Sequence, residues 1–219
     1  MEDTVLVVNC GSSSLKLALF DDQHRKLASA LAERLGQNDA FARVEGQEGT
    51  IPLDPGANHD QALTALVTAF RDQGLMASAP TAVGHRVVHG GETFREAVLL
   101  DDDVINAIED CAGLAPLHNP VNLSGIRATL AQFPGVPQTA VFDTAFHQTL
   151  PKRAFLYALP EAWYRDWGVR RYGFHGTSHA FMAAETARLL GKTPATTSVI
   201  SAHLGNGCSI TAIRDGISV

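Results

Sequence analysis

The sequence predicts an α/β domain with a largely enclosed sheet, followed by the start of a second domain, on three observations. The 219 residues are 45% hydrophobic and 18% charged, which is typical of a folded globular protein. Short apolar strand patterns come first and later alternate with stretches of helical periodicity. A strand–turn–strand pattern near the N-terminus recurs close to residue 200, which predicts two related units.

The first predicted element is a β-hairpin. Val5–Val8 is an apolar strand, residues 9–14 form a turn of small residues, and apolar residues alternate through Leu15–Phe20. Because a strand presents successive side chains to opposite faces, we expect one face of this hairpin to be buried. Further strands are expected at 27–34, 41–45 and 50–53.

Helices and strands alternate in the middle of the chain. A helix is expected from Asn58 to Asp72, because apolar residues recur at helical spacing and Gly74 follows. Asn119 and Pro120 are typical of a helix cap and first helical residue. The other expected elements are a strand over Thr81–Val88, a helix from Asp101–Asp103 to near Gly113, the Asn119 helix to Phe133, strands at 138–142 and 154–159, and a helix from Ser178 to Leu190 with Thr177 or Ser178 as its cap.

An internal repeat suggests that the sequence is part of a longer, two-lobed protein. Residues 198–213 repeat the plan of residues 4–20: an apolar strand, a turn of Gly, Asn and Ser, and an alternating strand. The second copy reaches a tight-turn signal at Arg214–Gly216, and the sequence ends at Val219. We therefore expect an N-terminal lobe over 1–150, and over 151–219 an interlobe segment with the first hairpin of a second lobe.

Charge, cysteines and hydropathy exclude several classes of protein. The net charge of −6 argues against a broad nucleic-acid surface. Cys10, Cys111 and Cys208 are odd in number and form no C-x-x-C pair, so we expect neither a disulfide framework nor a structural zinc site. There is no signal-peptide pattern and no apolar run long enough to span a membrane, so a cytoplasmic protein without a membrane partner is expected.

The two turns could both bind phosphate. Small residues let backbone amides approach a ligand closely, and hydroxyl groups add donors. Two such turns facing one another would hold the phosphates of a nucleotide from both sides. A single turn of this kind is weak evidence, because most are ordinary hairpin turns.

Two histidine pairs at i,i+4 spacing raise the alternative of a metal site. His85 and His89 lie in a strand pattern, where four residues span about 13 Å, too far to share one ion. His175 and His179 lack the glutamate of an H-E-x-x-H motif. We favour a different role for His175: it precedes a helix N-terminus, a place that attracts anions. A metal-dependent hydrolase stays open as an alternative.

Six sequence blocks, in order, resemble the acetate kinase family. Nearly the whole chain is spanned by them: Asn9-x-Gly-Ser-Ser-Ser-x-Lys16, His85–Gly91, Leu114–Pro120, Phe142–His147, Arg171–His179 and His203–Gly207. That family belongs to the sugar kinase, Hsp70 and actin superfamily, so the resemblance implies a ribonuclease-H-like lobe with a mixed sheet and a truncated second one. It also implies the reaction ATP + acetate ⇌ ADP + acetyl phosphate, Mg²⁺, and a homodimeric full-length enzyme.

The resemblance further implies a role for each matching residue. Asn9 resembles the magnesium ligand, Arg86 the residue that binds the acyl carboxylate, Asp143 the catalytic acid/base, and His175 the group that stabilises the transferring phosphoryl. The implied ATP-binding residues are Ser12, Ser14, Lys16, His203, Leu204, Gly205, Asn206 and Gly207. The implied pocket for the substrate methyl group consists of Val88, Leu117 and Phe174.

The chemistry supports most of these roles, with one exception. Phosphoryl transfer depends on positioning and on neutralising oxygen charge, which suits Arg86, His175 and backbone amides. A carboxylate substrate is already ionised at pH 7 and needs no general base. We therefore expect Asp143 to orient Arg86 or the water shell of the metal; a helix-capping Asp143 is the plainer alternative.

Two further functions compete with acetate phosphorylation. A kinase of propionate or butyrate would differ only in the volume of the acyl pocket. A non-catalytic lobe that binds nucleotide weakly is the second, and we expect the 219-residue chain by itself to be inactive.

Overall fold

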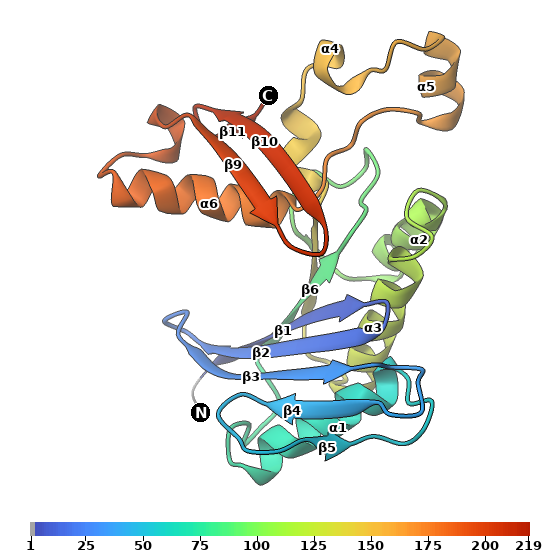
Figure 1. Cartoon of the computed structure of the whole chain (residues 1–219), viewed down its shortest axis with the longest axis vertical. Coiled ribbons are helices and arrows are strands. Elements are labelled where there is room, and N and C mark those ends of the chain that lie inside the picture. Colours follow the sequence, from blue (N-terminus) through green and yellow to red (C-terminus); the bar gives the residue numbers. More distant parts are fainter. Residues whose placement is uncertain (1–2) are drawn as a thin grey trace. The chain divides into compact units, whose positions relative to one another are not determined.

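The computed structural model describes residues 3–219, which form two compact units (Figure 1). The first unit comprises the chain up to Val87 together with Val98–Val141, and the second comprises Val88–Ala97 with Phe142–Val219. These units group residues that lie close together and do not test whether 1–150 folds as a lobe, so that boundary stays a prediction. Among the described residues, no helix combines the length and apolar character needed to cross a membrane.

The first unit is built on a mixed eight-stranded sheet. Its strands follow the order β5-β4-β3-β2-β1-β6-β8-β7. β1 and β6 are parallel, whereas the β1–β2, β2–β3, β3–β4, β4–β5 and β7–β8 pairs are antiparallel. The strands are β1 Thr4–Gly11, β2 Ser14–Asp21, β3 Lys26–Glu33, β4 Phe41–Val44, β5 Ile51–Pro52, β6 Ala82–Val87, β7 Val98–Leu99 and β8 Gln138–Phe142. The predicted first hairpin is confirmed, with Gly11 opposite Ser14 across a turn of two serines.

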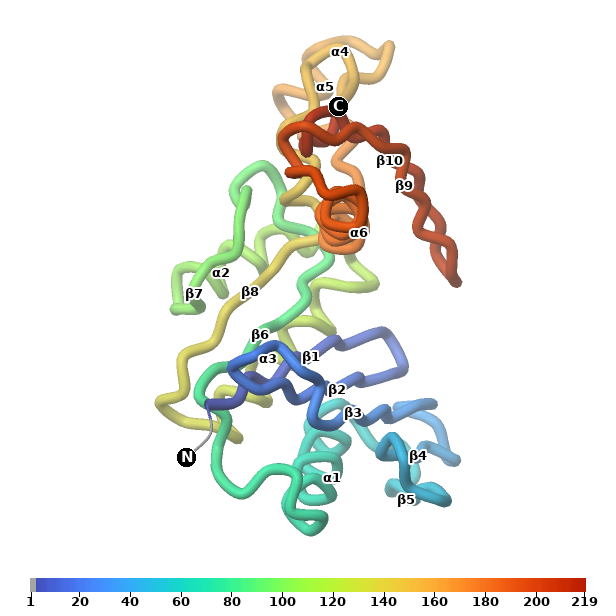
Figure 2. Tube along the Cα trace, turned by 90° about the vertical axis from the view of Figure 1, so that its left-hand side faces the viewer, coloured from blue at the N-terminus to red at the C-terminus, as the bar shows by residue number. Residues whose placement is uncertain are grey.

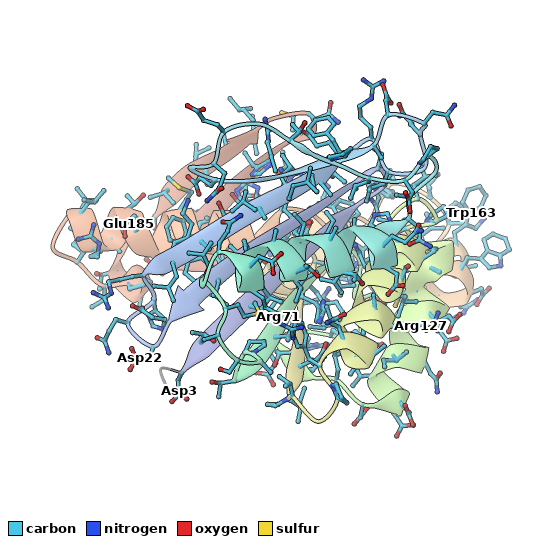
Figure 3. All side chains as sticks on the ribbon, turned by 90° about the horizontal axis from the view of Figure 1, so that it is seen from below. Asp3, Asp22, Arg71, Arg127, Trp163 and Glu185 are labelled. Carbon is cyan, nitrogen blue, oxygen red and sulfur yellow. The ribbon has the colours of Figure 1, made fainter. Side chains whose placement is uncertain are left out.

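Two helices cover one face of this sheet. α1 (His59–Asp72) and α3 (Asn119–Gln132) bury their apolar residues against the core face of β1 and β2, where Leu6, Leu15 and Leu19 are almost fully buried. Arg71 of α1 and Arg127 of α3 lie on the outer side (Figure 3). The predicted start of α1 is confirmed by a capping box, in which Asn58 and Gln61 each bind the backbone of the other.

The predicted start of α2 (Asp102–Asp110) is confirmed, whereas the predicted Asn119 cap of α3 is wrong. α2 is capped by the side chain of Asp101 and continues into a 3₁₀ turn at Cys111–Gly113. In α3 the cap is His118, so that Asn119 is the first helical residue and Pro120 lies in the first turn.

A close backbone approach joins α3 to β1. A Cβ atom added to Gly125 of α3 would lie 2.1 Å from the sulfur of Cys10 in β1. Cys10 is buried, and burial raises the pKa of its thiol to about 12, so this sulfur is a packing group and no nucleophile. The small residue at position 125 therefore sets how closely α3 packs on the sheet.

The second unit combines a three-stranded sheet with a long helix. The sheet order is β11-β10-β9, and α6 (Gly176–Leu189) packs beside β9, as its end-on view in Figure 2 shows. The strands are β9 Val199–Leu204, β10 Cys208–Arg214 and β11 Ile217–Ser218, and the shorter helices are α4 Lys152–Phe155, α5 Glu161–Trp167 and 3₁₀ turns at Ala145–Thr149 and Pro194–Thr196.

The predicted repeat is confirmed as a second antiparallel hairpin. Leu204 pairs with Cys208, Ala202 with Ile210 and Ile200 with Ala212. These six residues occupy one face of the hairpin, and the large ones are open to solvent: Ile200 is 80% exposed and Leu204 75%. In the first hairpin the corresponding face is the buried one.

Two predictions for the second unit are wrong. The strand expected at 154–159 is a single helical turn, α4, because Pro151 caps a helix at Lys152 and Pro160 opens the next helix. Helix α6 begins at Gly176, before Ser178, and its cap is His175 in the left-handed conformation (φ 56°), so neither Thr177 nor Ser178 caps it.

We predict that Gly125→Ala lowers the free energy of unfolding by about 1–3 kcal/mol, because the new methyl group collides with the Cys10 sulfur. Urea denaturation measures this loss. The double variant Cys10→Ala/Gly125→Ala is expected to regain part of it, because the obstructing sulfur is gone. Gly113→Ala, which meets nothing within 4 Å, is the control. Strict additivity of the two single changes would contradict this account.

Candidate active site

Three of the residues predicted to bind ligands lie side by side in the first unit. Asn9 of β1 pairs with Lys16 of β2, and β6 runs parallel to β1 with His85 beside Val8. Arg86 is thereby placed next to Asn9, and its Nη1 atom donates a hydrogen bond to Asn9 Oδ1 at 3.3 Å. The strand register thus gathers an amide, an ammonium and a guanidinium group on the sheet face opposite the core.

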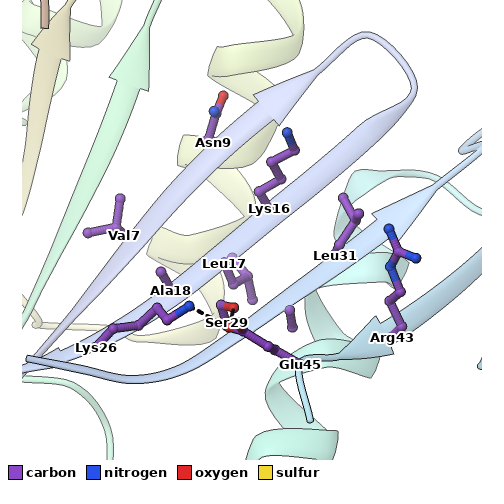
Figure 4. Close-up of a pocket in the computed structure, with 11 residues that line it drawn as sticks. Val7, Asn9, Lys16, Leu17, Ala18, Lys26, Ser29, Leu31, Arg43 and Glu45 are labelled. Carbon is purple, nitrogen blue, oxygen red and sulfur yellow. Dashed lines mark hydrogen bonds and ion pairs between the residues drawn. The ribbon is translucent and has the colours of Figure 1, made fainter. Parts of the chain in front are cut away.

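Asn9 and Lys16 line a shallow pocket on this same face (Figure 4). It has a volume of about 460 Å³, and Val7, Ala18 and Leu31 form part of its lining. Lys26 and Glu45 form an ion pair at 2.5 Å within it. Arg43, which also lines the pocket, pairs with Glu33, so Lys16 is the lining cation that stands beside Asn9.

Side chains of α1 and α3 form hydrogen bonds with the backbone just before the β1–β2 turn. The backbone carbonyl of Gly11 accepts a hydrogen bond from His59 Nε2 at 2.7 Å, and the carbonyl of Cys10 accepts one from Asn122 Nδ2 at 2.9 Å. Because these carbonyls are occupied, the end of β1 has a fixed position. Ser12 of the predicted phosphate turn is exposed and Ser14 is half-buried.

His85 and Leu117 have opposite surroundings in this unit. His85 is buried, its Nε2 lies 2.8 Å from Gln138 Oε1, and burial lowers its pKa to about 4. Leu117, predicted to line the methyl pocket, is 74% exposed, so in the described unit it packs against little.

In the second unit, Asp143 lies directly against the start of α6. It follows β8, is 2% exposed, and its backbone carbonyl accepts a hydrogen bond from Gly176 N–H at 2.8 Å. A Cβ at position 176 would lie 2.3 Å from that carbonyl oxygen, which only glycine avoids. Asp143 therefore fixes the end of α6 that carries His175.

His175 and His203 are stacked. Their ring centroids are 4.0 Å apart and the ring planes differ by 17°. His175 Nδ1 lies 2.8 Å from Ser209 Oγ, and a Cβ on Gly207 would lie 3.3 Å from His175 Nε2. One edge of the His175 ring therefore faces a serine, while the other faces the Gly205–Gly207 turn.

The turn between β9 and β10 is short, consists mostly of small residues and is exposed to solvent. Gly205 N–H donates to the carbonyl of Gly207 at 3.0 Å, and Leu204, Gly205, Asn206 and Gly207 are exposed. His203 pairs with Ser209 one step behind the closing pair Leu204–Cys208. Because the turn carries no bulky side chain except Asn206, its backbone is accessible to an anion.

Two more histidines, His147 and His179, lie near His175 and His203. His147 Nε2 lies 3.0 Å from the carbonyl of Phe174, so this nitrogen carries the proton, and Nδ1 accepts from Ser218. Burial lowers the pKa of His147, partly offset by the Phe174 bond and the negative charge of Asp143. His179 is completely buried, and burial followed by its histidine neighbours lowers its pKa.

Phe174 belongs to an aromatic patch in the second unit. The ring of His89 makes an edge contact with Phe174 at 5.6 Å and with Tyr172 at 4.5 Å. Val88 precedes His89 in the chain and is buried, whereas Phe174 is 39% exposed. Of the two residues predicted to line the methyl pocket here, Phe174 is therefore the accessible one.

His175 and His179 share one hydrogen-bonding partner. Within residues 3–219, no three or more His, Cys, Asp or Glu side chains gather as metal ligands. His175 Nδ1 and His179 Nε2 both contact the hydroxyl of Ser209, each at 2.8 Å. The i,i+4 spacing thus serves a common serine.

Sequence reasoning missed the serines. Ser178 Oγ lies 3.0 Å from His203 Nδ1, Ser201 Oγ lies 2.9 Å from His179 Nδ1, and Ser209 bridges two rings. Strand alternation could have placed Ser201, His203 and Ser209 on one face of the hairpin. Ser201 and His203 are two residues apart on β9, and Ser209 of β10 lies opposite His203. Nothing in the pattern indicated that α6 presents its histidines to that face.

We predict that His85 makes stability depend on pH. Its pKa is about 4 in the folded chain and near 6.5 when unfolded, so the unfolded chain binds the proton first as pH falls. This stabilisation is complete above pH 6.5 and lost toward pH 4, by about 3 kcal/mol in total. Urea denaturation of the wild type and of His85→Gln across this range measures it. Parallel pH curves for the two proteins would contradict the prediction.

Comparisons with known proteins identify the family of this chain. The profile of the acetokinase family matches residues 4–219. The chain is 54% identical to acetate kinase of Shewanella loihica, covering 98% of this chain and 55% of the relative, and 50% identical to that of Chromobacterium violaceum, covering 99% and 55%.

Solved structures give the same result. Porphyromonas gingivalis acetate kinase superposes with a TM-score of 0.92 at 41% identity, and a propionate kinase from Francisella tularensis with 0.90 at 40%; each match covers 99% of this chain and 56% of the other. The chain thus spans about half the length of these relatives. By its profile, its relatives and its fold, the chain belongs to the acetokinase family.

Proposed function

We propose that this chain takes part in reversible phosphoryl transfer from ATP to acetate, forming acetyl phosphate and ADP. The observation that carries the proposal is the Asn9–Lys16–Arg86 group on a strand framework shared with acetate kinases. The stacked His175 and His203 beside an open glycine turn support it independently. Both groups supply positive charge or N–H donors, which phosphoryl transfer requires.

In this proposal the first unit binds the substrate carboxylate and part of the nucleotide. Arg86 presents a planar guanidinium, suited to a carboxylate, and its bond to Asn9 limits the orientations that the side chain adopts. Lys16 attracts a phosphate of ATP, and Ser12 and Ser14 donate from the turn.

Mg²⁺ fits Asn9 as one protein ligand. The amide Oδ1 is a hard oxygen donor, and Mg²⁺ commonly takes one or two protein oxygens together with waters and phosphate oxygens. Its second lone pair remains usable beside the 3.3 Å bond from Arg86. When bound, the ion would neutralise charge on the phosphates.

The second unit stabilises the transferring group. His175 Nε2 and the amides of the Gly205–Gly207 turn are close enough to one another to serve the same phosphoryl oxygens. His203, Leu204 and Asn206 complete the proposed ATP-binding turn. Val88 and Phe174, with Leu117 of the first unit, are proposed to contact the methyl group of acetate.

We propose that Asp143 is an orienting carboxylate and no general base. Acetate is ionised at neutral pH, so no proton has to be removed. Asp143 lies near His147, whose pKa its negative charge raises, and its backbone holds the start of α6.

Phosphorylation of propionate is the second candidate function. A propionate kinase from Francisella tularensis has nearly the same TM-score as the acetate kinase from Porphyromonas gingivalis. One methylene in an apolar pocket changes transition-state binding by only about 1–3 kcal/mol. A nucleotide-binding lobe without turnover remains the proposal for the 219-residue chain by itself.

We also propose a cytoplasmic, homodimeric full-length enzyme that binds no nucleic acid. The net charge of −6 disfavours nucleic acid. All three cysteines are present as free thiols, as a reducing compartment allows.

The decisive assay traps acyl phosphate with hydroxylamine. It is applied to the 219-residue chain and to a chimera that adds, after Val219, the part of the Shewanella loihica relative that this chain does not cover. We expect the chimera to form product from acetate more efficiently than from propionate or butyrate, and the chain alone to form none. A chimera that unfolds cooperatively yet phosphorylates none of the three would contradict the proposal.

Arg86→Ala in the active chimera is expected to lower kcat/KM for acetate about 100-fold or more, because the carboxylate loses its charged partner. The matched control is Arg127→Ala on the outer side of α3, where Arg127 forms an exposed ion pair with Glu109. Equal effects of the two changes would argue against a specific carboxylate site.

Asp143→Asn is expected to reduce turnover without changing the shape of the pH–rate profile. A general base would instead give the wild type an acid limb with a carboxylate pKa, and the variant would lack it. Observation of that difference would restore the acid/base role.

A further inference from the structure

The hydroxyl of Ser209 connects two histidines of the second unit. Its Oγ lies 2.8 Å from His175 Nδ1 and 2.8 Å from His179 Nε2. His179 Nδ1 in turn lies 2.9 Å from Ser201 Oγ. The result is a continuous row of hydrogen-bonding groups, His175–Ser209–His179–Ser201, which we call the histidine–serine relay.

A serine hydroxyl carries one proton and can accept two, so two arrangements make every bond with the proton of Ser209 kept inside the relay, while a third, in which Ser209 accepts from both rings, would direct that proton elsewhere. In the first, Ser209 donates to His175 Nδ1, His179 Nε2–H donates to Ser209, and Ser201 donates to His179 Nδ1. In the second, every bond is reversed: His175 Nδ1–H donates to Ser209, Ser209 donates to His179 Nε2, and His179 Nδ1–H donates to Ser201.

The charge of His175 biases the choice between these arrangements. A neutral His175 in the first arrangement carries its proton on Nε2, the nitrogen beside Gly207. A positively charged His175 has a proton on both nitrogens, so Ser209 must accept from it, and the second arrangement is then the one in which the Ser209 proton still bonds His179. In both of these states Nε2 carries an N–H beside the turn.

We propose that Ser209 is a positioning residue for His175: through the relay it favours an N–H on His175 Nε2 in both charge states and couples the tautomer of His179 to the charge of His175. When His175 becomes charged, the Ser209 proton passes to His175 Nδ1, the Nε2 proton of His179 passes to Ser209, the Ser201 proton passes to His179 Nδ1, and Ser201 takes one proton from solvent. The assignment of that N–H to a phosphoryl oxygen rests on the proposed function. The relay itself does not.

The surroundings are consistent with His179 remaining neutral throughout. It is 0% exposed, and its titratable neighbours are His147 from the segment after β8, His175 at the start of α6 and His203 of β9. Asp143 is the charged group near His147. Burial and the three histidines all lower the pKa of His179, which favours its neutral form.

The test is a titration by ¹⁵N NMR of the 219-residue chain with labelled histidine. Protonated and unprotonated ring nitrogens differ in chemical shift, so each tautomer is read directly. From about pH 8 to about pH 5, around the ordinary histidine pKa of about 6.5, the His179 proton should move from Nε2 to Nδ1 with the midpoint of His175. A His179 tautomer that does not change with the charge of His175 would overturn the relay, and this wild-type result needs no variant.

Variants identify the connecting group. In Ser209→Ala the His179 tautomer should no longer follow His175, and Ser209→Thr, which keeps a hydroxyl, should restore the coupling. Ser198→Ala is the matched control, because Ser198 bonds the backbone of Asp215 and no histidine. Coupling that persists in Ser209→Ala would assign the connection to another group.

Activity supplies a separate readout. In the chimera, Ser209→Ala should lower kcat about 10- to 100-fold with little change in KM for ATP or acetate, because binding survives while orientation is lost. An unchanged kcat would remove the positioning role. An inactive parent chimera would contradict the proposed function and leave the NMR result standing.

Discussion

A single main-chain hydrogen bond, from Gly176 to the carbonyl of Asp143, fixes the arrangement of the second unit. It brings the first turn of α6 so close to the segment after β8 that no side chain fits at position 176. His175 then takes the left-handed cap conformation, and His179 follows one turn later in the buried interior. His175 and His179 contact Ser209 of the β9–β10 hairpin because this hydrogen bond fixes where α6 begins and which way its first turn faces.

Regular periodicity made much of the fold predictable, and local chemistry made the rest difficult. The first hairpin was predictable because apolar residues recur at every second position. Helix α1 was predictable because apolar residues recur about every 3.6 positions and its ends carry clear capping signals. The apolar residues at 154–159 matched a strand equally well, yet Pro151 and Pro160 favoured short helices. The start of α6 was missed because a histidine cap in the left-handed region is an unusual signal. The role of Ser209 depends on contacts thirty or more residues away, for which no sequence period exists.

The two hairpins show how one plan can carry different chemistry. The first closes on two serines and the second on Gly205, Asn206 and Gly207, so the second exposes more backbone. The residue pair next to the last apolar pair before the turn is Asn9 and Lys16 in the first hairpin. In the second hairpin the corresponding pair is His203 and Ser209. The first pair offers an amide oxygen and a lysine ammonium group, and the second offers an imidazole ring and a hydroxyl group.

The uncovered face of the second hairpin affects how the isolated polypeptide behaves in solution. Ile200, Leu204 and Ile210 form a flat apolar strip on extended backbone, the kind of surface through which sheets stick to one another. We therefore expect the isolated chain to aggregate more as its concentration rises, and salting-out anions to promote this.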